Sequence, residues 1–203
     1  VSRNKLPEHK LGVQPKLDVV KAGDKVRLGV FEAEFIHVNH SIADACAIAL
    51  STPRGVIVHT GDFKLDVSPI GGEMMDLTRI GEYGRQGVLL LMCESTNVDR
   101  AGYTPSERNV GSALDAIFMQ NPHKRVIIAT FSSNVHRVQQ IINSSVKFGR
   151  KVAVTGRSMI NVIGAAVRLG YMDVPDGVLI DISEIGRYPG EMITIVTTGS
   201  QGE

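Results

Sequence analysis

The sequence is poor in aromatic side chains: it has no tryptophan, six phenylalanines and four tyrosines among 203 residues. Proteins that bind single-stranded nucleic acid commonly stack the bases on aromatic rings, and this composition does not indicate such a surface. The formal net charge is +1, which excludes a global basic field as the means of attracting a polyanion. Any binding of nucleic acid would therefore depend on lysine and arginine side chains arranged locally.

Cysteine and long apolar runs are scarce as well. Cys46 and Cys93 are the only cysteines, and both lie in apolar runs without the spacing of metal ligands. This usage is typical of a reducing compartment, so we expect a cytoplasmic protein. The longest apolar run, residues 88–93, is far shorter than the roughly 20 residues that cross a bilayer. We therefore expect no signal peptide and no membrane partner.

The first part of the chain has the pattern of β-strands. Residues 31–38 alternate in the manner of a half-buried strand, and residues 45–50 and 56–58 flank a Ser-Thr-Pro-Arg-Gly turn that is typical of a hairpin. Turn residues then interrupt the pattern, and only residues 74–83 could form a short helix. We predict a first domain over residues 1–72 and a connecting segment over residues 73–87.

From residue 88 onward, apolar runs of strand length alternate with runs of helical periodicity. The predicted strands are 88–93, which we expect to be buried on both faces, 126–129, 151–154 and 192–196. The predicted helices are 107–120, 134–148 and 159–169. Short strands that alternate with helices indicate an α/β fold with a parallel, doubly wound, Rossmann-like sheet. We assign residues 88–203 to this second domain.

Two strand ends in the first domain carry side chains that can bind a metal ion. His40 follows the strand at 31–38, and Asp62 follows the strand at 56–58. Two such strand ends side by side can hold a cation such as zinc. An aspartate that bridges two divalent ions is a common means of activating water against a phosphodiester. A surface histidine and a turn aspartate explain the same two residues equally well.

Polar loops follow the strands of the second domain. Ser132, Ser133 and Asn134 lie between a strand and a helix, where hydroxyls and free backbone N–H groups form an anion site. Arg157 and Ser158 repeat the arrangement one strand later in the chain, on what we predict to be an adjacent strand end, and the arginine adds a fork suited to phosphate. Ordinary helix capping by the same serine and asparagine side chains is the alternative.

Two further polar residues of the second domain have two interpretations each. Glu94 follows the strand at 88–93, where the carboxyl ends of parallel strands line the ligand crevice of an open sheet. A polar loop that caps a helix would explain the same glutamate. His136 falls in the first helical turn after Asn134, from which it could reach a substrate or face solvent.

Several short motifs occur together and in a fixed order. They are KLPEH at 5–9, HSIADA at 40–45, HTGDFKLD at 59–66, ESTN at 94–97, FSSNVHR at 131–137, GRSM at 156–159 and TTGSQGE at 197–203. The set resembles the ribonuclease J family, an RNA-processing branch of the metallo-β-lactamase superfamily. The resemblance implies part of a metallo-β-lactamase αββα sandwich over residues 1–72, followed by a β-CASP domain over residues 88–203.

The resemblance also implies an activity and the residues that serve it. The family uses zinc, with two ions in the complete enzyme, to hydrolyse RNA phosphodiesters in a cleft between the two domains, both as an endonuclease and as a 5′-to-3′ exonuclease. RNA is the implied substrate, and a homo-oligomer is the implied assembly. The implied metal ligands are His40 and Asp62, the implied catalytic residues are Asp62 and Glu94, and the implied substrate-binding residues are Ser132, Ser133, Asn134, His136, Arg157 and Ser158.

The sequence departs from the family pattern in its first zinc motif. A His-x-His-x-Asp-His cluster is expected upstream of KLPEH and does not occur here, and a further histidine ligand is expected downstream of TTGSQGE. The resemblance therefore implies an internal segment of a longer enzyme with an incomplete zinc site. We expect this segment alone to be inactive.

Two other functions are compatible with some of the residues. A non-catalytic phosphate- or nucleotide-binding α/β module would explain the polar loops, but it would leave His40 and Asp62 without a role. A small-molecule hydrolase of the same superfamily, such as a lactonase, would use the metal ligands. The ESTN, FSSN and GRSM motifs disfavour this second alternative, because small-molecule members lack the added domain.

Overall fold

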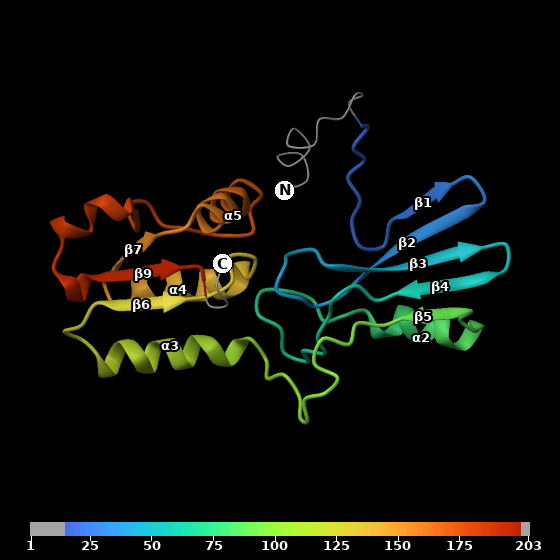
Figure 1. Ribbon diagram of the computed structural model, residues 1–203, viewed down its shortest axis with the longest axis horizontal. Helices are drawn as coiled ribbons and strands as arrows, with labels where there is room; N and C mark the ends of the chain where they lie inside the picture. The colour runs from blue at the N-terminus through green and yellow to red at the C-terminus, as the bar shows by residue number, and fades with distance from the viewer. Residues whose placement is uncertain (1–14, 200–203) are drawn as a thin grey trace. The chain divides into compact units, whose positions relative to one another are not determined.

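The computed structural model describes residues 15–199 of the chain, which form two compact units (Figure 1). Of the described residues, 15–40 and 44–105 belong to the first unit, and 41–43 and 106–199 belong to the second. Each unit has its own sheet and its own hydrophobic core. No helix among residues 15–199 is long and apolar enough to span a membrane.

The first unit is built on a five-stranded sheet with the order β1-β2-β3-β4-β5. Its strands are β1 (Lys25–Leu28), β2 (Phe31–His37), β3 (Cys46–Thr52), β4 (Gly55–His59) and β5 (Leu90–Met92). The first four strands pair in antiparallel fashion, and β5 runs parallel to β4. The hairpin predicted around the Ser-Thr-Pro-Arg-Gly turn is confirmed, with Thr52 opposite Gly55 at its end.

One face of this sheet packs against helix α2 (Leu77–Gln86) (Figure 1). The period of two along each strand brings alternate apolar side chains to this face. The buried residues of this core are Ile36, Val38, Ala47, Ala49, Val58, Met75 and Tyr83. Helix α2 lies within the predicted connecting segment, and the side chain of Asp76 accepts the N–H of Arg79 to cap its first turn.

The prediction that residues 88–93 form a buried strand of the second domain is wrong. The strand is Leu90–Met92, it pairs with β4 through Ile57 opposite Leu90, and all three of its side chains are exposed. Within the described part of the chain, β5 is an edge strand. A short apolar run does not reveal whether its strand lies in the middle or at the edge of a sheet. Glu94, which follows β5, therefore belongs to the first unit.

The second unit is built on a four-stranded sheet with the order β6-β9-β7-β8. Its strands are β6 (Val126–Ala129), β7 (Lys151–Val154), β8 (Leu179–Ile180) and β9 (Ile193–Thr197). All pairs are parallel, which confirms the predicted α/β class and the Rossmann-like sheet. Strand β8 and the short helices η2 (Ile182–Arg187) and η3 (Gly190–Met192) are not predicted from the sequence.

Three helices of the second unit contribute to one core. They are α3 (Arg108–Gln120), α4 (Val135–Lys147) and α5 (Arg157–Arg168), each within a residue or two of its predicted bounds. Apolar side chains from all three pack with Val152 of β7 and Val196 of β9. Ile117 and Val146, which the periodicity places on the apolar helix faces, are exposed. The parallel strands direct their carboxyl ends to one edge of the sheet, where polar loops lead into α4 and α5.

Candidate functional site

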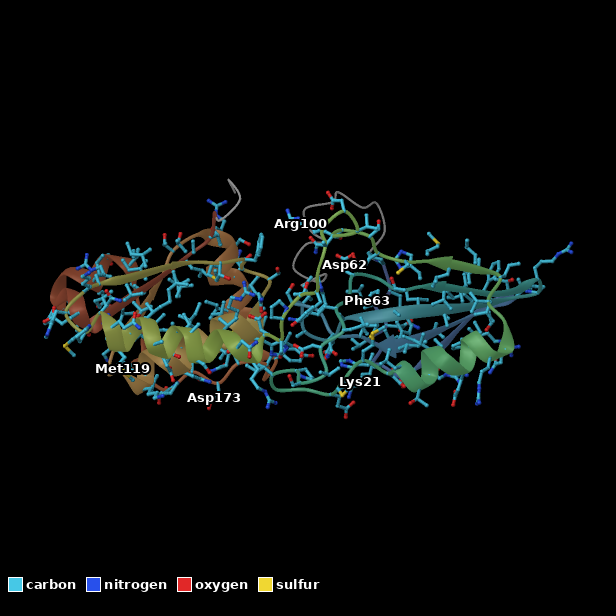
Figure 2. All side chains as sticks on the ribbon, turned by 90° about the horizontal axis from the view of Figure 1, so that it is seen from below. Lys21, Asp62, Phe63, Arg100, Met119 and Asp173 are labelled. Atoms are coloured by element: carbon cyan, nitrogen blue, oxygen red, sulfur yellow. The ribbon has the colours of Figure 1, made fainter. Side chains whose placement is uncertain are left out.

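The two predicted metal ligands lie together in the first unit. His40 follows β2. Asp62, which is labelled in Figure 2, lies in the turn after β4. The Nε2 atom of His40 is 3.9 Å from Oδ2 of Asp62. The backbone N–H of Lys64 donates to the carbonyl oxygen of Asn39 (2.8 Å), which joins the two loops just beside the pair. The imidazole is 30% exposed and the carboxylate is 74% exposed, so both can be reached from solvent.

The backbone of the turn that carries Asp62 has a conformation that favours glycine at position 61. Gly61 has a φ of +60°, and a Cβ atom there would lie 3.1 Å from the carbonyl oxygen of Cys46. Both conditions favour glycine. The N–H of Gly61 donates to Nδ1 of His59 (3.0 Å), and its carbonyl oxygen accepts the hydroxyl of Thr60 (2.8 Å). Two neighbouring side chains therefore hold both polar groups of this glycine.

Glu94 adds a third polar side chain near this pair. Its Oε2 atom accepts the N–H of Thr96 (2.9 Å), so the glutamate folds back on its own loop. The capping alternative predicted a helix after Glu94, but the next helix, α3, begins only at Arg108. Hydrogen bonds from Thr96, and then the nearby charge of His40, lower the pKa of the Glu94 carboxyl. Glu94 is therefore an ionised carboxylate at neutral pH. The backbone N–H of Glu94 donates to the hydroxyl of Thr60 (3.1 Å), a contact that we did not predict from the sequence.

The donor atoms present are of the kind that zinc binds, but they form only part of a ligand set. An imidazole nitrogen and a carboxylate oxygen suit zinc, and a catalytic zinc takes three protein ligands. Over residues 15–199, no three histidine, cysteine, aspartate or glutamate side chains are grouped so as to hold a metal ion. His40 and Asp62 can therefore supply two ligands, and Glu94 can influence them through its charge.

The structure brings two of the predicted substrate-binding residues into contact in the second unit. The hydroxyls of Ser132, after β6, and Ser158, in α5, are 2.8 Å apart. The prediction that these loops follow adjacent strands is wrong, because β9 lies between β6 and β7. Thr198 follows β9, and a Cβ atom on Gly156 would lie 2.8 Å from its Oγ1 atom. Thr198, which belongs to the TTGSQGE motif noted in the sequence, thus lies beside the start of α5.

The N-termini of α4 and α5 differ in how they are capped. The side chain of Asn134 is buried and accepts the N–H of Arg137 (3.0 Å), so this asparagine caps α4. Helix α5 begins after Gly156, which has a φ of +98° and offers no side chain for capping. Anions bind well at such helix N-termini. Of the two helices, α5 therefore has the N-terminus better suited to a phosphate.

The remaining predicted residues of this group lie near the two helix starts. Arg157 and Ser158 are exposed in the first turn of α5, and His136 is half-buried in the first turn of α4. Ser133 is half-buried, and its carbonyl oxygen accepts the N–H of Val135. The KLPEH motif at 5–9 and the last four residues of the TTGSQGE motif, 200–203, lie outside the described residues.

The second unit matches a known domain family. Residues 123–203 match the family described as ribonuclease J, beta-CASP domain. A solved structure of a protein of unknown function from Enterococcus faecalis V583 has a TM-score of 0.64 to this chain at 17% identity, and covers 93% of this chain and 46% of its own. At this identity the similarity concerns the fold alone.

Curated relatives match nearly the whole chain. Ribonuclease J of Synechocystis is 46% identical over 202 residues, which are 99% of this chain and 31% of the relative. Ribonuclease J of Helicobacter pylori is 45% identical over 91% of this chain and 27% of the relative, and that of Mycolicibacterium smegmatis is 43% identical over 99% and 36%. The chain thus spans about a third of the length of these relatives. These matches confirm that the chain resembles the ribonuclease J family, and that residues 123–203 resemble its beta-CASP domain.

Proposed function

We propose that this chain is part of a metal-dependent ribonuclease that hydrolyses RNA phosphodiesters. The observation that carries the proposal is the pair formed by His40 and Asp62, with the ionised carboxylate of Glu94 nearby. One sheet positions all three side chains, because His40 follows its strand β2, Asp62 follows β4 and Glu94 follows β5. The curated relatives of the chain carry the name ribonuclease J, which supports RNA as the substrate.

The residues of the first unit have separate roles in this proposal. His40 and Asp62 would bind zinc, of which the complete enzyme would hold two ions, together with at least one further protein ligand. Bound zinc supplies a water of lowered pKa at neutral pH. Asp62 would also orient that water through its carboxylate. Glu94 would add negative charge at the site, and the hydrogen bond that its carboxylate accepts from the Thr96 N–H lowers its pKa and holds it against its own loop.

The residues of the second unit would bind the RNA backbone. The uncapped start of α5, the guanidinium of Arg157 and the hydroxyls of Ser132 and Ser158 provide donors for a phosphate. Asn134 caps α4 and would shape the loop that carries Ser132 and Ser133. His136 would contact the RNA from the first turn of α4. A homo-oligomeric assembly and a cytoplasmic location stay predictions.

Removal of metal is the direct test of this function. The complete protein that carries this sequence, stripped with a chelator, is expected to lose RNA cleavage by at least about a hundredfold and to regain it with Zn²⁺. End-labelled RNA analysed on gels measures both internal and terminal cleavage. RNA binding without cleavage in the presence of metal would indicate a non-catalytic module. Hydrolysis of a lactone without cleavage of RNA would indicate a small-molecule hydrolase.

A second prediction concerns the 5′ end of the RNA. We propose that Arg157 and the start of α5 bind a 5′-terminal monophosphate, which carries more charge than an internal diester and so gains more from the arginine fork. Arg157→Ala is expected to weaken exonuclease activity on 5′-monophosphorylated RNA by about 2 kcal/mol, the scale of one charged hydrogen bond. Internal cleavage should change less, because it does not use the 5′ end.

The measurement compares 5′-monophosphorylated and 5′-triphosphorylated RNA with each protein. Arg168→Ala is the matched control, since it removes an exposed arginine from the last turn of the same helix. The control should keep the wild-type ratio of rates on the two RNAs. If Arg157→Ala also keeps that ratio, Arg157 does not bind the 5′ end and the proposed role is wrong.

A further inference from the structure

Thr60 lies between the two loops that carry Asp62 and Glu94. It follows the last residue of β4, and its side chain is buried, with 6% of the residue exposed. Its backbone N–H donates to the carbonyl oxygen of Met92 (3.0 Å), which extends the pairing of β4 and β5 by one step. The loop after β4 then leads to Asp62, and the loop after β5 leads to Glu94. The hydrogen bond of Thr60 to Met92 thus continues the pairing of β4 with β5 one residue beyond the end of β4.

The hydroxyl of Thr60 makes one hydrogen bond to each loop. It donates to the carbonyl oxygen of Gly61 (2.8 Å), the residue directly before Asp62. It accepts the backbone N–H of Glu94 (3.1 Å). A hydroxyl can donate one hydrogen bond and accept others, and this one uses both capacities. Neither an alanine nor a valine at this position could replace either bond.

From this arrangement we infer that Thr60 is a positioning residue for the proposed metal-dependent reaction. Its hydroxyl fixes the backbone of the Asp62 turn relative to the backbone of Glu94. A misplacement of catalytic groups by about 1 Å can reduce a rate by about a hundredfold, so a single connecting atom between two such loops affects catalysis. The inference rests on the proposed function, because Asp62 and Glu94 matter in this way only if they serve the same reaction.

The test compares three variants of the complete protein. Thr60→Val removes the hydroxyl and keeps the branched shape, whereas Thr60→Ser keeps the hydroxyl. Thr52→Val is the matched control: the hydroxyl of Thr52 also donates to a carbonyl oxygen, that of Gly55 (2.8 Å), and accepts a backbone N–H, that of Arg54 (3.1 Å). Thr52 is the last residue of β3 and lies opposite Gly55, the first residue of β4, whereas Thr60 follows the last residue of β4.

We expect Thr60→Val to lower kcat on RNA by about tenfold, the scale of one hydrogen bond, with an unchanged KM. Thr60→Ser should retain most of the wild-type kcat, and Thr52→Val should leave kcat unchanged although it loses the same kinds of bond. A purely structural role would predict similar losses for the two valine variants. A wild-type kcat in Thr60→Val, or a kcat in Thr60→Ser as low as in Thr60→Val, would overturn the inference.

Amide hydrogen exchange separates this inference from the proposed function. The Glu94 amide should exchange about tenfold faster in Thr60→Val than in wild type and should be unchanged in Thr60→Ser. If the wild-type protein needs no metal to cleave RNA, the proposed function fails, and the exchange rate still decides whether the hydroxyl holds the two loops. If the exchange rate does not change in Thr60→Val, the positioning role is wrong whatever the activity.

Discussion

Asp62→Ala is expected to abolish cleavage of RNA, both internal and 5′ to 3′, with a loss in kcat of at least about a thousandfold. The carboxylate lies 3.9 Å from His40 and is accessible to solvent, so in our proposal it is at once a metal ligand and the group that orients the attacking water. Internal and 5′-to-3′ cleavage would use the same metal site, so the loss of this metal ligand should affect both. This distinguishes Asp62 from Arg157, whose loss should affect mainly the mode that uses the 5′ end.

The measurement combines kinetics on labelled RNA with the zinc content of the purified protein. Asp62→Ala should contain less zinc than wild type and should show no change in far-ultraviolet circular dichroism, because the side chain makes no contribution to a core. Asp176→Ala removes an exposed aspartate of the second unit and serves as the control. Full activity in Asp62→Ala would contradict the metal site proposed here.

Acid is expected to destabilise the first unit through Glu34. This glutamate of β2 is buried, and its carboxylate accepts hydrogen bonds from Nε (2.6 Å) and Nη2 (2.7 Å) of Arg79 and from the hydroxyl of Tyr83 (2.6 Å). The ammonium of Lys25 lies 3.2 Å from it. Chiefly because of Arg79, the pKa of the Glu34 carboxyl is lowered to about 2 from its ordinary value of 4.5.

The direction of the pH effect follows from this shift. In the unfolded chain the carboxyl titrates near 4.5, and in the folded chain it titrates near 2. The stabilisation is therefore complete above about pH 4.5 and is lost as the pH falls toward about 2. A shift of this size corresponds to about 3 kcal/mol in the free energy of unfolding. The same contacts join β2 to α2, so their loss should open the core between sheet and helix.

Glu34→Gln tests this prediction, because it keeps the shape of the side chain and removes its charge. The free energy of unfolding is measured with urea at about pH 7 and about pH 3, and exchange of the β2 amides identifies the first unit. The variant should be less stable than wild type at neutral pH, and its stability should fall less in acid. Glu73→Gln, at an exposed glutamate, is the control. Parallel losses in wild type and Glu34→Gln would show that Glu34 does not determine the acid sensitivity.

Local sequence patterns predict the elements of the second unit well. The apolar periodicity of residues 134–148 corresponds to α4, and the short run at 151–154 is β7. These elements follow one another along the chain, and each buries one face against its neighbours. The hydrophobic periodicity of a short stretch of sequence is therefore enough to predict most of these helices and strands. The order β6-β9-β7 was not predictable in this way, because the insertion of the last strand between two earlier ones depends on contacts across the whole unit.

The same distinction applies to the candidate site. The types and positions of His40 and Asp62 in their motifs predicted that they serve one function, and the geometry brings them within 3.9 Å. Glu94 was assigned to the wrong domain, because an apolar strand can join either of two sheets, and only the pairing of Leu90 with Ile57 decides between them. The contact of Ser132 with Ser158 across the end of β9 likewise arises only in the folded unit.

The sequence by itself therefore determined the resemblance to the ribonuclease J family, the α/β class, the helices and most strands, because motifs and hydrophobic periodicity are local properties of the chain. The tertiary structure alone decided which sheet β5 joins, which hydroxyl connects Asp62 to Glu94, and which cation pairs with Glu34. Thr60 and Glu94 are 34 residues apart, and Glu34 and Arg79 are 45 apart. Hydrogen bonds over such separations depend on strand order and on the packing of α2 against its sheet, and no local pattern of residues specifies either.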